Sequence, residues 1–394
     1  MASKLFLSIM LLFLLLSLPL INAVGASSQM WSRTYGDEEQ EVAQSLVETS
    51  DGGYAIAGYK RFYRASDDFW EDFWLVKTDR YGNLEWNRTY GGLGDECAYS
   101  LVETSDGGYA IAGQTSSFGA GSFDFWLIKV DGSGNMEWNQ TYGGPGSERA
   151  VSLVMASDGG YAIAGHATSI YSSSIYSTDR DFWLIKTDAN GNMEWNQTYA
   201  ENRLDYASSV VETSDGGFAI AGVAWYFPNM PIGNSWLVKT DANGNLEWNR
   251  TYGEPDYGYW NSMVQTSDGG YALAGYTSSS PAGGGVTNND VWLAKTDAFG
   301  NIEWNQKYGG LEDDDANSLI VTSDGGYALA GYTGSFGAED YDFWLIKTDE
   351  YGIIPEFPSW IILPLFLMAT FSAILLKKKL FHQRSQCARD IFAY

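Results

Sequence analysis

The stretches TSDGGYAIAG (104–113) and TSDGGYALAG (322–331) are almost identical, and four further versions of the same ten residues occur elsewhere in the chain. In all six, Asp-Gly-Gly separates two short apolar segments, and successive copies are 52 to 57 residues apart. Repetition at such a period indicates that one supersecondary unit recurs along the chain. The aspartates that mark the copies are Asp51, Asp106, Asp158, Asp215, Asp268 and Asp324.

The second copy shows the whole unit, in which four segments rich in Val, Ile, Tyr, Trp and Thr are bounded by turn residues. This pattern predicts four β-strands per repeat. Asp-Gly between the first and second strands suits a two-residue hairpin, whose central residues need positive φ. Asp-x-x-Gly-Asn between the third and fourth, as in 188–192, suits a longer hairpin with a left-handed glycine. The four segments are AYSLVETS (98–105), DGGYAIAG (106–113), DFWLIKVD (124–131) and MEWNQTYGG (136–144).

Four antiparallel strands repeated at about 50 residues match the blade of a β-propeller. The second strand reads Ala-Ile-Ala-Gly or Ala-Leu-Ala-Gly, whereas the third and fourth carry tryptophans, which suits sheets that crowd at an axis and splay at a rim. The sixth copy lacks a fourth strand, and an orphan one, MWSRTYG (30–36), precedes the first copy. We therefore expect an all-β, six-bladed β-propeller of four-stranded antiparallel blades over 30–352. Pairing of Trp31–Tyr35 with Phe343–Thr348 would close it.

The two ends of the chain predict export and anchoring. Residues 1–26 combine a positive charge, an apolar run and small residues, as a secretory signal peptide does, and an uncleaved anchor is the alternative. An apolar stretch at 359–376 followed by three lysines predicts a transmembrane helix with a cytoplasmic basic tail, 377–394. The residues between the ends are then expected on the extracellular face of the membrane. In that topology Cys97 and Cys387 cannot form a disulfide.

The charge of the chain excludes some partners. The net charge is −26, and it becomes −31 without the ends, which hold six basic residues and one acidic residue. Such a field repels nucleic acid and anionic lipid and attracts cations. Solubility at a salty surface is the alternative explanation.

Two resemblances bear on fold and location. The repeat resembles those of bacterial and archaeal β-propeller proteins, notably quinoprotein-like blades in which a glycine turn precedes a tryptophan-bearing outer strand, as in DANGNMEW (188–195). PEFPSW (355–360) is similar to the PEF-type C-terminal sorting signal of archaeal surface proteins. This implies that an archaeosortase exchanges the anchor for another surface attachment, and a retained transmembrane anchor is the alternative. The sorting motif, in the linker 353–358, is Pro355, Glu356, Phe357 and Pro358.

No catalytic constellation is visible in the sequence. His166 is the single histidine between the two predicted end segments, and nothing marks a Ser, Cys or Asp partner for it. The cofactor-binding residues of quinoproteins are not found either, so we predict that the protein is not an enzyme, with a quinoprotein-like enzyme as a remaining alternative. The cofactor is unknown, and calcium is the one considered. A weak calcium site is predicted in an acidic loop, against the alternative of a solvated charge run, at Asp313, Asp314 and Asp315.

Four Asn-x-Thr sequons occupy one slot of the predicted fourth strand, and the fifth copy has Lys307 in place of the threonine. On an exported protein such sequons are acceptors of N-glycans, although the same residues also suit an exposed strand. The four asparagines are Asn87, Asn139, Asn196 and Asn249.

The loops between second and third strands, and those between repeats, vary in length and sequence, and a scaffold usually places function in such loops. They carry aromatic residues that the repeat does not require. These could stack on sugar rings or anchor a protein, or else pack over the ends of the sheets. We expect a membrane-anchored extracellular propeller that binds a cell-surface glycan or an envelope protein through these loops. A structural envelope component without a ligand is the alternative. The candidate ligand-binding residues are Tyr63, Trp70, Trp225, Tyr226, Tyr259 and Trp260.

Overall fold

The structure is a computed structural model in which the described residues form strands and turns and no helix. None of these residues therefore belongs to a helix that could cross a membrane. The predicted signal peptide, sorting motif and membrane span lie outside the described residues. Those residues are 31–65, 68–168, 179–201, 204–226, 232–253, 257–278, 288–337 and 341–354.

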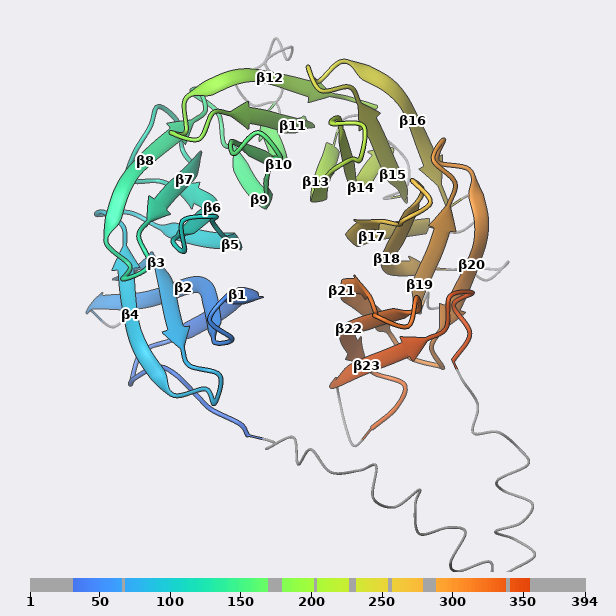
Figure 1. Ribbon diagram of the computed structural model, residues 1–394, viewed down its shortest axis with the longest axis horizontal. Helices are drawn as coiled ribbons and strands as arrows, with labels where there is room; N and C mark the ends of the chain where they lie inside the picture. Colours follow the sequence, from blue (N-terminus) through green and yellow to red (C-terminus); the bar gives the residue numbers. More distant parts are fainter. Residues whose placement is uncertain are drawn as a thin grey trace, which may run out of the picture. The chain divides into compact units, whose positions relative to one another are not determined.

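The strands β1–β23 follow the repeat, four to each copy except the last, which has three. Neighbouring strands within a copy are antiparallel and lie in chain order (Figure 1). The first copy comprises β1 (Glu41–Glu48), β2 (Tyr54–Ala65), β3 (Asp68–Thr78) and β4 (Leu84–Tyr90). The second comprises β5 (Glu96–Glu103), β6 (Tyr109–Thr115), β7 (Asp124–Val130) and β8 (Met136–Tyr142). The third comprises β9 (Arg149–Met155), β10 (Tyr161–Thr168), β11 (Arg180–Thr187) and β12 (Met193–Tyr199).

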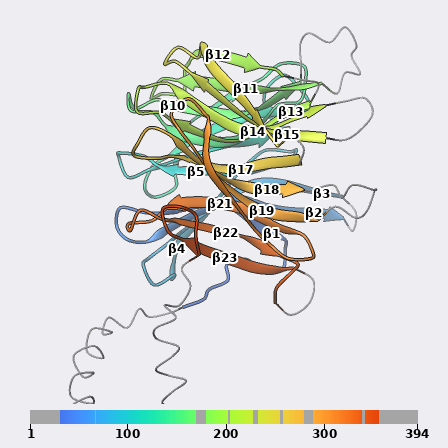
Figure 2. The same ribbon diagram turned by 90° about the vertical axis from the view of Figure 1, so that its right-hand side faces the viewer.

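The later copies repeat the same order. The third and fourth copies form one eight-stranded sheet because a single parallel pairing, Arg180 with Leu204, joins them. The fourth comprises β13 (Leu204–Glu212), β14 (Phe218–Tyr226), β15 (Ile232–Thr240) and β16 (Leu246–Tyr252). The fifth comprises β17 (Tyr257–Gln265), β18 (Tyr271–Ser278), β19 (Asn289–Thr296) and β20 (Ile302–Tyr308). The sixth comprises β21 (Asp314–Val321), β22 (Tyr327–Thr333) and β23 (Asp342–Thr348), side by side in Figure 2.

The chain divides into two compact units, and the boundary between them runs through the sheet β5–β8. The first unit is Met1–Ile111 with Lys129–Glu137, and the second is Ala112–Ile128 with Trp138–Tyr394. In the second unit the first strands of successive copies, β9, β13, β17 and β21, lie next to one another, and the fourth strands lie at the other end of their sheets (Figure 1).

The turn between first and second strands differs from the predicted two-residue hairpin. The Thr104 N–H donates to the Gly108 carbonyl at 2.9 Å, and the Gly107 N–H donates to the Thr104 carbonyl at 2.9 Å. Three residues thus lie in the loop, and the left-handed conformation falls on Gly107 (φ 79°) rather than on both central residues. The Asp106 carboxylate accepts the Thr104 hydroxyl and the Gly108 N–H, which closes a turn in which Gly107 takes the left-handed conformation.

The turn between third and fourth strands is the predicted longer hairpin. Gly191 has φ 76°, and Oδ1 of Asp188 accepts the N–H groups of Asn190 and Asn192, each at 2.8 Å. The Asn192 side chain donates to the other oxygen of Asp188 at 2.8 Å. These bonds explain why Asp, Gly and Asn recur at fixed spacing in this turn.

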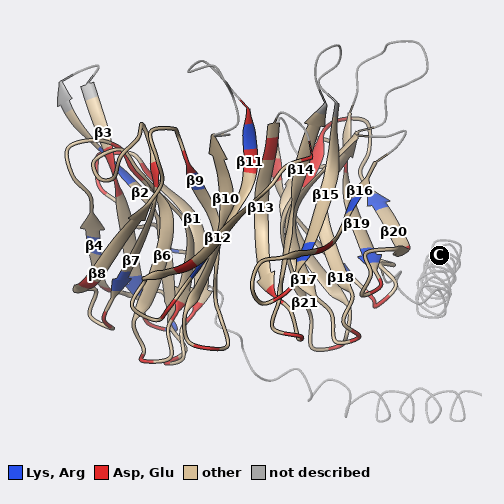
Figure 3. Ribbon diagram, turned by 90° about the horizontal axis from the view of Figure 1, so that it is seen from above, with Lys and Arg blue, Asp and Glu red and all other residues tan. Residues whose placement is uncertain are grey.

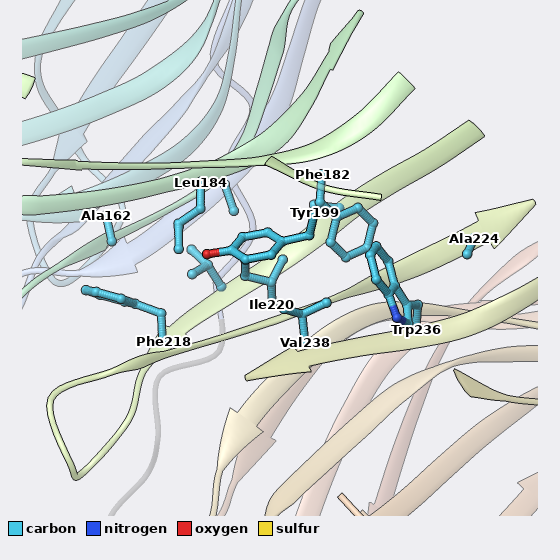
Figure 4. Packing of buried hydrophobic residues seen from close by; sticks show 12 residues of the cluster. Ala162, Phe182, Leu184, Tyr199, Phe218, Ile220, Ala224, Trp236 and Val238 are labelled. Atoms are coloured by element: carbon cyan, nitrogen blue, oxygen red, sulfur yellow. The ribbon is translucent and has the colours of Figure 1, made fainter. Parts of the chain in front are cut away.

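The core lies between sheets, so that each copy buries its apolar residues against the next. Figure 4 shows Phe182 and Tyr199 of the third copy facing Phe218, Ile220 and Trp236 of the fourth. The rings of Phe182 and Trp236 are 4.5 Å apart. The small second-strand residues allow this close approach, since alanine occupies two of every four positions there.

Each fourth strand also contacts the following copy through a Trp-x-x-x-Tyr pair. Trp248 lies edge-on to Tyr271 at 6.0 Å, and the Tyr252 hydroxyl donates to the Gly300 carbonyl at 2.8 Å. Edge-to-face aromatic pairs and a satisfied buried hydroxyl both stabilise such an interface. The same two contacts recur from copy to copy, for example from β4 to the second copy.

Residues 31–35 contact the first copy in this same way. Trp31 lies edge-on to Tyr54 at 5.8 Å, and the Tyr35 hydroxyl donates to the Gly82 carbonyl at 2.7 Å. The segment forms no strand of its own, which differs from the prediction. Its predicted pairing with β23 would join the two units and stays a prediction.

In each complete copy a buried lysine joins the third and fourth strands to the turn between the first and second strands. Nζ of Lys186 contacts the carboxylates of Asp158 at 2.6 Å and Glu194 at 2.9 Å, and donates to the Thr187 carbonyl at 2.9 Å. Such a buried cation is stabilised only when it is fully paired. Lys347 in the three-stranded sheet has Asp324 as its carboxylate partner, and its side chain is 42 % exposed, because the described residues of this sheet include no fourth strand to supply a glutamate.

Acidic pairs occupy the opposite end of the sheets. A Cβ on Gly91 would lie 2.0 Å from Oδ1 of Asp72 and 2.8 Å from Oε2 of Glu96, so the glycine leaves room for both carboxylates to face each other. Burial, and then the charge of Glu96, raises the pKa of Asp72 to about 6. Equivalent pairs with an intervening glycine are Asp124 with Glu148 and Asp290 with Asp314.

Trp260, a candidate ligand-binding residue, lies in the core with none of its surface exposed. It stacks on Trp292 at 4.1 Å, whereas in the preceding copy a phenylalanine, Phe182, contacts the corresponding Trp236. The fourth copy has Ser235 at the position of that phenylalanine. Trp260, which replaces an alanine of the repeat, therefore fills the space that the missing ring would leave, and cannot contact a ligand.

We expect Trp260→Ala to lower the free energy of unfolding by about 3–5 kcal/mol, as for other buried tryptophans. Ser235→Phe alone should cost about 1–3 kcal/mol by overpacking. Because the double variant restores the residue pair of the other copies, it should be more stable than Trp260→Ala alone. Urea denaturation of the three variants measures these free energies. If the double variant lost the sum of the two single losses, the phenylalanine introduced at position 235 would not compensate for the missing Trp260 ring.

The acidic pairs predict a pH dependence. An acid whose pKa is raised by folding binds its proton more tightly in the folded state, so its contribution is favourable below its unfolded pKa of 3.8 and is lost as the pH rises to about 6. Between pH 4 and pH 7 the wild type should therefore lose more stability than Asp72→Asn, in which no proton is exchanged. Urea denaturation at pH 4 and at pH 7 measures the free energy of unfolding of both proteins. An equal loss of stability in the wild type and in Asp72→Asn would contradict the raised pKa of Asp72 beside Glu96.

Candidate functional site

Two positions of the repeat diverge strongly while the residues around them stay nearly constant. One lies at the start of the first strand, the other directly after the Ala-Gly of the second strand, and the two face each other across the antiparallel pair. In the second unit the facing pairs are Arg149 with His166, Tyr206 with Val223, Tyr259 with Tyr276, and Asp315 with Tyr332.

A β-bulge beside these positions explains the glycine that ends the repeated decapeptide. In the fifth copy the register shifts between Trp260 and Ser262, opposite Gly275. A Cβ on Gly275 would lie 1.9 Å from the Tyr259 carbonyl oxygen, so only glycine fits there. Bulges redirect side chains and are common beside functional sites. A constant glycine thus supports a neighbouring position that is free to vary.

At one side of the second unit, cationic and aromatic groups surround a buried histidine. The guanidinium of Arg180 lies 5.5 Å from the Tyr206 ring, which meets the His166 ring edge-on at 4.9 Å. Arg149 pairs with His166 across the strands. Figure 3 shows the basic and acidic residues that begin β11, which are Arg180 and Asp181.

The electrostatics of His166 follow from this setting. Burial, and then the positive charges of Arg180 and Arg149, lowers the pKa of His166 to about 3, so the imidazole is neutral at pH 7. The residue is 6 % exposed, and its Nδ1 atom has no hydrogen-bond partner within the described part of the chain. A buried polar atom without a partner is costly in a folded protein, and a ligand is one way to satisfy it.

Tyrosines and an acid with a raised pKa follow in the fifth and sixth copies. Tyr259 stacks on Tyr276 with ring centroids 6.0 Å apart, and Oδ1 of Asp315 accepts the Asn261 amide at 2.9 Å. Burial raises the pKa of Asp315 to about 7, against the opposing effect of the Asn261 bond. Burial also raises the pKa of Tyr259 and of Tyr332 to about 12, so both keep their hydroxyl protons at neutral pH.

We call these residues the divergent cluster. Two guanidinium groups can pair with an anionic oxygen, and the tyrosine hydroxyls and Asp315 can hydrogen-bond a polar ligand. Strongly shifted pKa values gather at functional sites more often than elsewhere. The cluster comprises Arg149, His166, Arg180, Tyr206, Tyr259, Tyr276, Asp315 and Tyr332.

The candidate aromatic residues are found in both units, in different surroundings. Tyr63 and Trp70 lie in the β2–β3 hairpin of the first unit, where Tyr63 is 48 % exposed and Trp70 stacks on Phe62 at 5.3 Å. In the second unit Tyr259 joins the divergent cluster, and Trp225 is half-buried at the end of β14. The side chain of Tyr226 lies outside the described part of the structure.

The weak calcium site at Asp313, Asp314 and Asp315 gains no support. Oδ1 of Asp313 accepts the Asn289 N–H at 2.9 Å, and Oδ2 of Asp314 accepts the Ser335 hydroxyl at 2.7 Å. The three carboxylates thus serve separate hydrogen bonds. Over the ranges that the structure describes, no three His, Cys, Asp or Glu side chains are placed to hold one metal ion.

Comparison with known proteins gives limited likenesses. No family model matches the chain. The Regulatory protein FlaEY of Caulobacter vibrioides is 31 % identical over 160 residues. The match covers 36 % of this chain but 17 % of that protein, so the chain spans less than a fifth of its relative.

Solved structures match over more of the chain but with low similarity. An α-L-arabinofuranosidase from Fusarium graminearum is 12 % identical, with 80 % of this chain and 94 % of that chain covered and a TM-score of 0.48. A polysaccharide lyase, an ulvan lyase, is 11 % identical, with coverages of 84 % and 83 % and a TM-score of 0.48. The WD40 domain of Neurospora crassa Pan2 is 10 % identical, with coverages of 76 % and 94 % and a TM-score of 0.42.

The prediction that the protein is not an enzyme is contradicted by these neighbours. They include a lyase and an arabinofuranosidase, and a puromycin hydrolase also matches. A lack of sequence motifs for catalysis does not by itself exclude an enzyme. The likenesses are too low to assign any reaction to this chain.

We expect the His166 imidazole to remain neutral from pH 8 down to about pH 4, because burial and two arginines oppose its protonation. NMR of the ring nitrogens measures this directly, with a histidine-containing model peptide as the reference for an ordinary imidazole. A His166 midpoint near 6.5 would contradict the burial and the arginine field described above. A higher titration midpoint of His166 in Arg180→Gln would show that the charge of Arg180 lowers the pKa of His166 in the wild type.

Proposed function

We propose that this chain is an exported six-bladed β-propeller, anchored on the outer face of the cell membrane, and that it binds an acidic cell-surface saccharide at the divergent cluster. The observation that carries the proposal is that Arg149 lies opposite a buried His166, that Arg180 lies against the Tyr206 ring beside it, and that Nδ1 of His166 has no hydrogen-bond partner among the described residues. The PEF-like motif and the apolar segment 359–376 support the anchored location, with an archaeosortase as the expected processing partner.

The acidic pairs support closure of the propeller. In the described pairs, the residue two before the third-strand tryptophan faces the acid that begins the next copy. Between the fourth and fifth copies, Asn234 and Gly258 occupy the positions that hold the two acids at the other junctions. Both acids are therefore replaced together. Asp342 in the last copy and Glu41 in the first occupy the two remaining positions of this series in the sequence, as expected if the last copy is followed by the first.

The unfinished sixth sheet supports closure independently. The side chains of Phe343 and Leu345 on β23 are exposed, and a long apolar edge strand is a site for pairing with another segment. Residues 31–35 already contact the first copy as a fourth strand contacts the copy after it. Residues 31–35 would therefore supply the fourth strand that completes the sixth sheet.

The chemistry of the divergent cluster favours a saccharide with carboxylate or sulfate groups. Guanidinium groups bind such anions in a forked geometry, while tyrosine rings pack on the apolar faces of sugars. Long-range attraction does not explain binding of an anion, because the whole chain is acidic. The affinity must then come from local contacts to Arg149 and Arg180.

We expect the purified full-length chain to bind tetragalacturonate, an acidic tetrasaccharide, and not the neutral maltotetraose. Arg180→Gln should weaken binding tenfold or more, because a charge-assisted hydrogen bond contributes about 1.5–3 kcal/mol. Arg250→Gln is the matched control, since Arg250 lies 5.6 Å from the Trp248 ring outside the cluster. Calorimetry at 150 mM salt measures the binding of both saccharides to the wild type and of tetragalacturonate to the two variants.

If maltotetraose binds as tightly as tetragalacturonate, the proposed preference for an acidic saccharide is wrong. If the wild type and Arg180→Gln bind tetragalacturonate with equal affinity, the saccharide does not bind at the divergent cluster. If neither tetragalacturonate nor a sulfated tetrasaccharide binds the wild type, saccharide recognition by this cluster is wrong, and a purely structural envelope role is favoured.

A further inference from the structure

The asparagines of the sequons lie in the fourth strands, which end the described sheets. In β4 the residues Glu85, Asn87 and Thr89 point to one face and Trp86 to the other, because side chains alternate along a strand. Asn87 and Thr89 are both exposed. The two residues that define a sequon thus lie together on one accessible face of an edge strand.

A tryptophan of the third strand fixes the orientation of the amide. The Trp74 indole N–H donates to Oδ1 of Asn87 at 3.4 Å, and the same bond joins Trp126 to Asn139 at 3.2 Å. Trp183 donates to Asn196 at 3.1 Å. Because the oxygen faces the tryptophan, the nitrogen Nδ2 lies on the other branch of the amide; in Asn196 it contacts the sulfur of Met193, a weak acceptor.

Two copies depart from this arrangement in different ways. Asn305 accepts the Trp292 indole N–H at 3.3 Å but is followed by Lys307 instead of threonine. Asn249 has the threonine but is half-buried, and the Trp236 indole nitrogen has no partner among the described residues. One copy therefore has the geometry without the sequon, and the other has the sequon without the geometry.

Space for a sugar exists beside two of these asparagines. A groove of about 400 Å³ is lined by Asn87, Trp74 and residues 33–37, and one of about 370 Å³ is lined by Asn249 and Trp236. Both lie between a fourth strand, or the segment equivalent to it, and the outer strands of the next copy. A saccharide on Nδ2 of Asn87 could occupy its groove without breaking the tryptophan bond, since the linkage leaves Oδ1 as an acceptor.

We infer that Asn87, Asn139 and Asn196 are N-glycosylated, with lower occupancy at Asn249. The inference rests on the proposed export. In the transfer, Nδ2 bonds to the anomeric carbon of a lipid-phosphate-linked saccharide, whose carbon–oxygen bond to the phosphate breaks. The lipid phosphate leaves with the electron pair, and the transferase removes one amide proton. Glycans on the edge strands would also prevent their pairing with other chains.

The test is expression of the full chain, with its own leader, in a cell that has an N-oligosaccharyltransferase, followed by mass spectrometry of glycopeptides from surface-exposed protein. We expect saccharide on Asn87, Asn139 and Asn196, loss at Asn139 in Thr141→Val, and a new site at Asn305 in Lys307→Thr. The last variant is decisive because it adds a threonine to a geometry that already exists.

Each alternative result has a separate meaning. Protein on the cell surface without saccharide at the three sites overturns the inference and leaves the proposed location intact. Protein found only inside the cell overturns the proposed location and the inference with it. No gain at Asn305 in Lys307→Thr, or equal occupancy of Asn249 and Asn87, overturns the role given to the tryptophan bond.

Discussion

The contact of each fourth strand with the following copy is the constraint on which the rest of the structure depends. Its tryptophan needs an aromatic ring in the next second strand, and its tyrosine hydroxyl needs a carbonyl in the next turn. No copy therefore buries its own apolar surface, and each must match the shape of its neighbour. This explains why the same ten residues recur six times: a change in one copy is tolerated only when the adjoining copy compensates, as Trp260 does for Ser235.

The same constraint decides where the molecule can vary. Residues between the sheets are held by packing, and those in the turns by the Asp and Gly bonds, so neither can diverge freely. The bulge is different, because Gly275 and its equivalents approach a neighbouring carbonyl oxygen, while the residues beside them differ from copy to copy. Chemical diversity collects there, and a rigid framework thus presents a set of unlike side chains. This is the arrangement that a specific binding site requires.

Much of the fold could be predicted from the sequence because its signals are local. Alternating apolar residues mark the strands, and Asp-x-x-Gly-Asn marks a turn with one left-handed glycine. The errors arose where the deciding contact is distant in sequence. The prediction that Trp260 contacts a ligand was wrong, since only its stacking on Trp292 across the sheet shows that it is core. Of the divergent cluster, the sequence predicted only Tyr259 and Asp315 as site residues, because the cluster lies at strand ends and not in the variable loops. The signal for the other members is the variation on either side of the constant Ala-Gly.

The proposed site is basic in an acidic protein, which has consequences for selectivity. Charges separated by more than about 8 Å are largely screened at physiological ionic strength, so Arg149 and Arg180 would act on a ligand only at short range. The surrounding negative charge would disfavour polyanions that make no direct contact with these two arginines. His166 adds a second restriction: its neutral, buried ring cannot contribute a charge, but it offers a hydrogen-bonding nitrogen at a fixed position. Recognition by such a site depends on the geometry of the ligand's polar groups more than on its total charge.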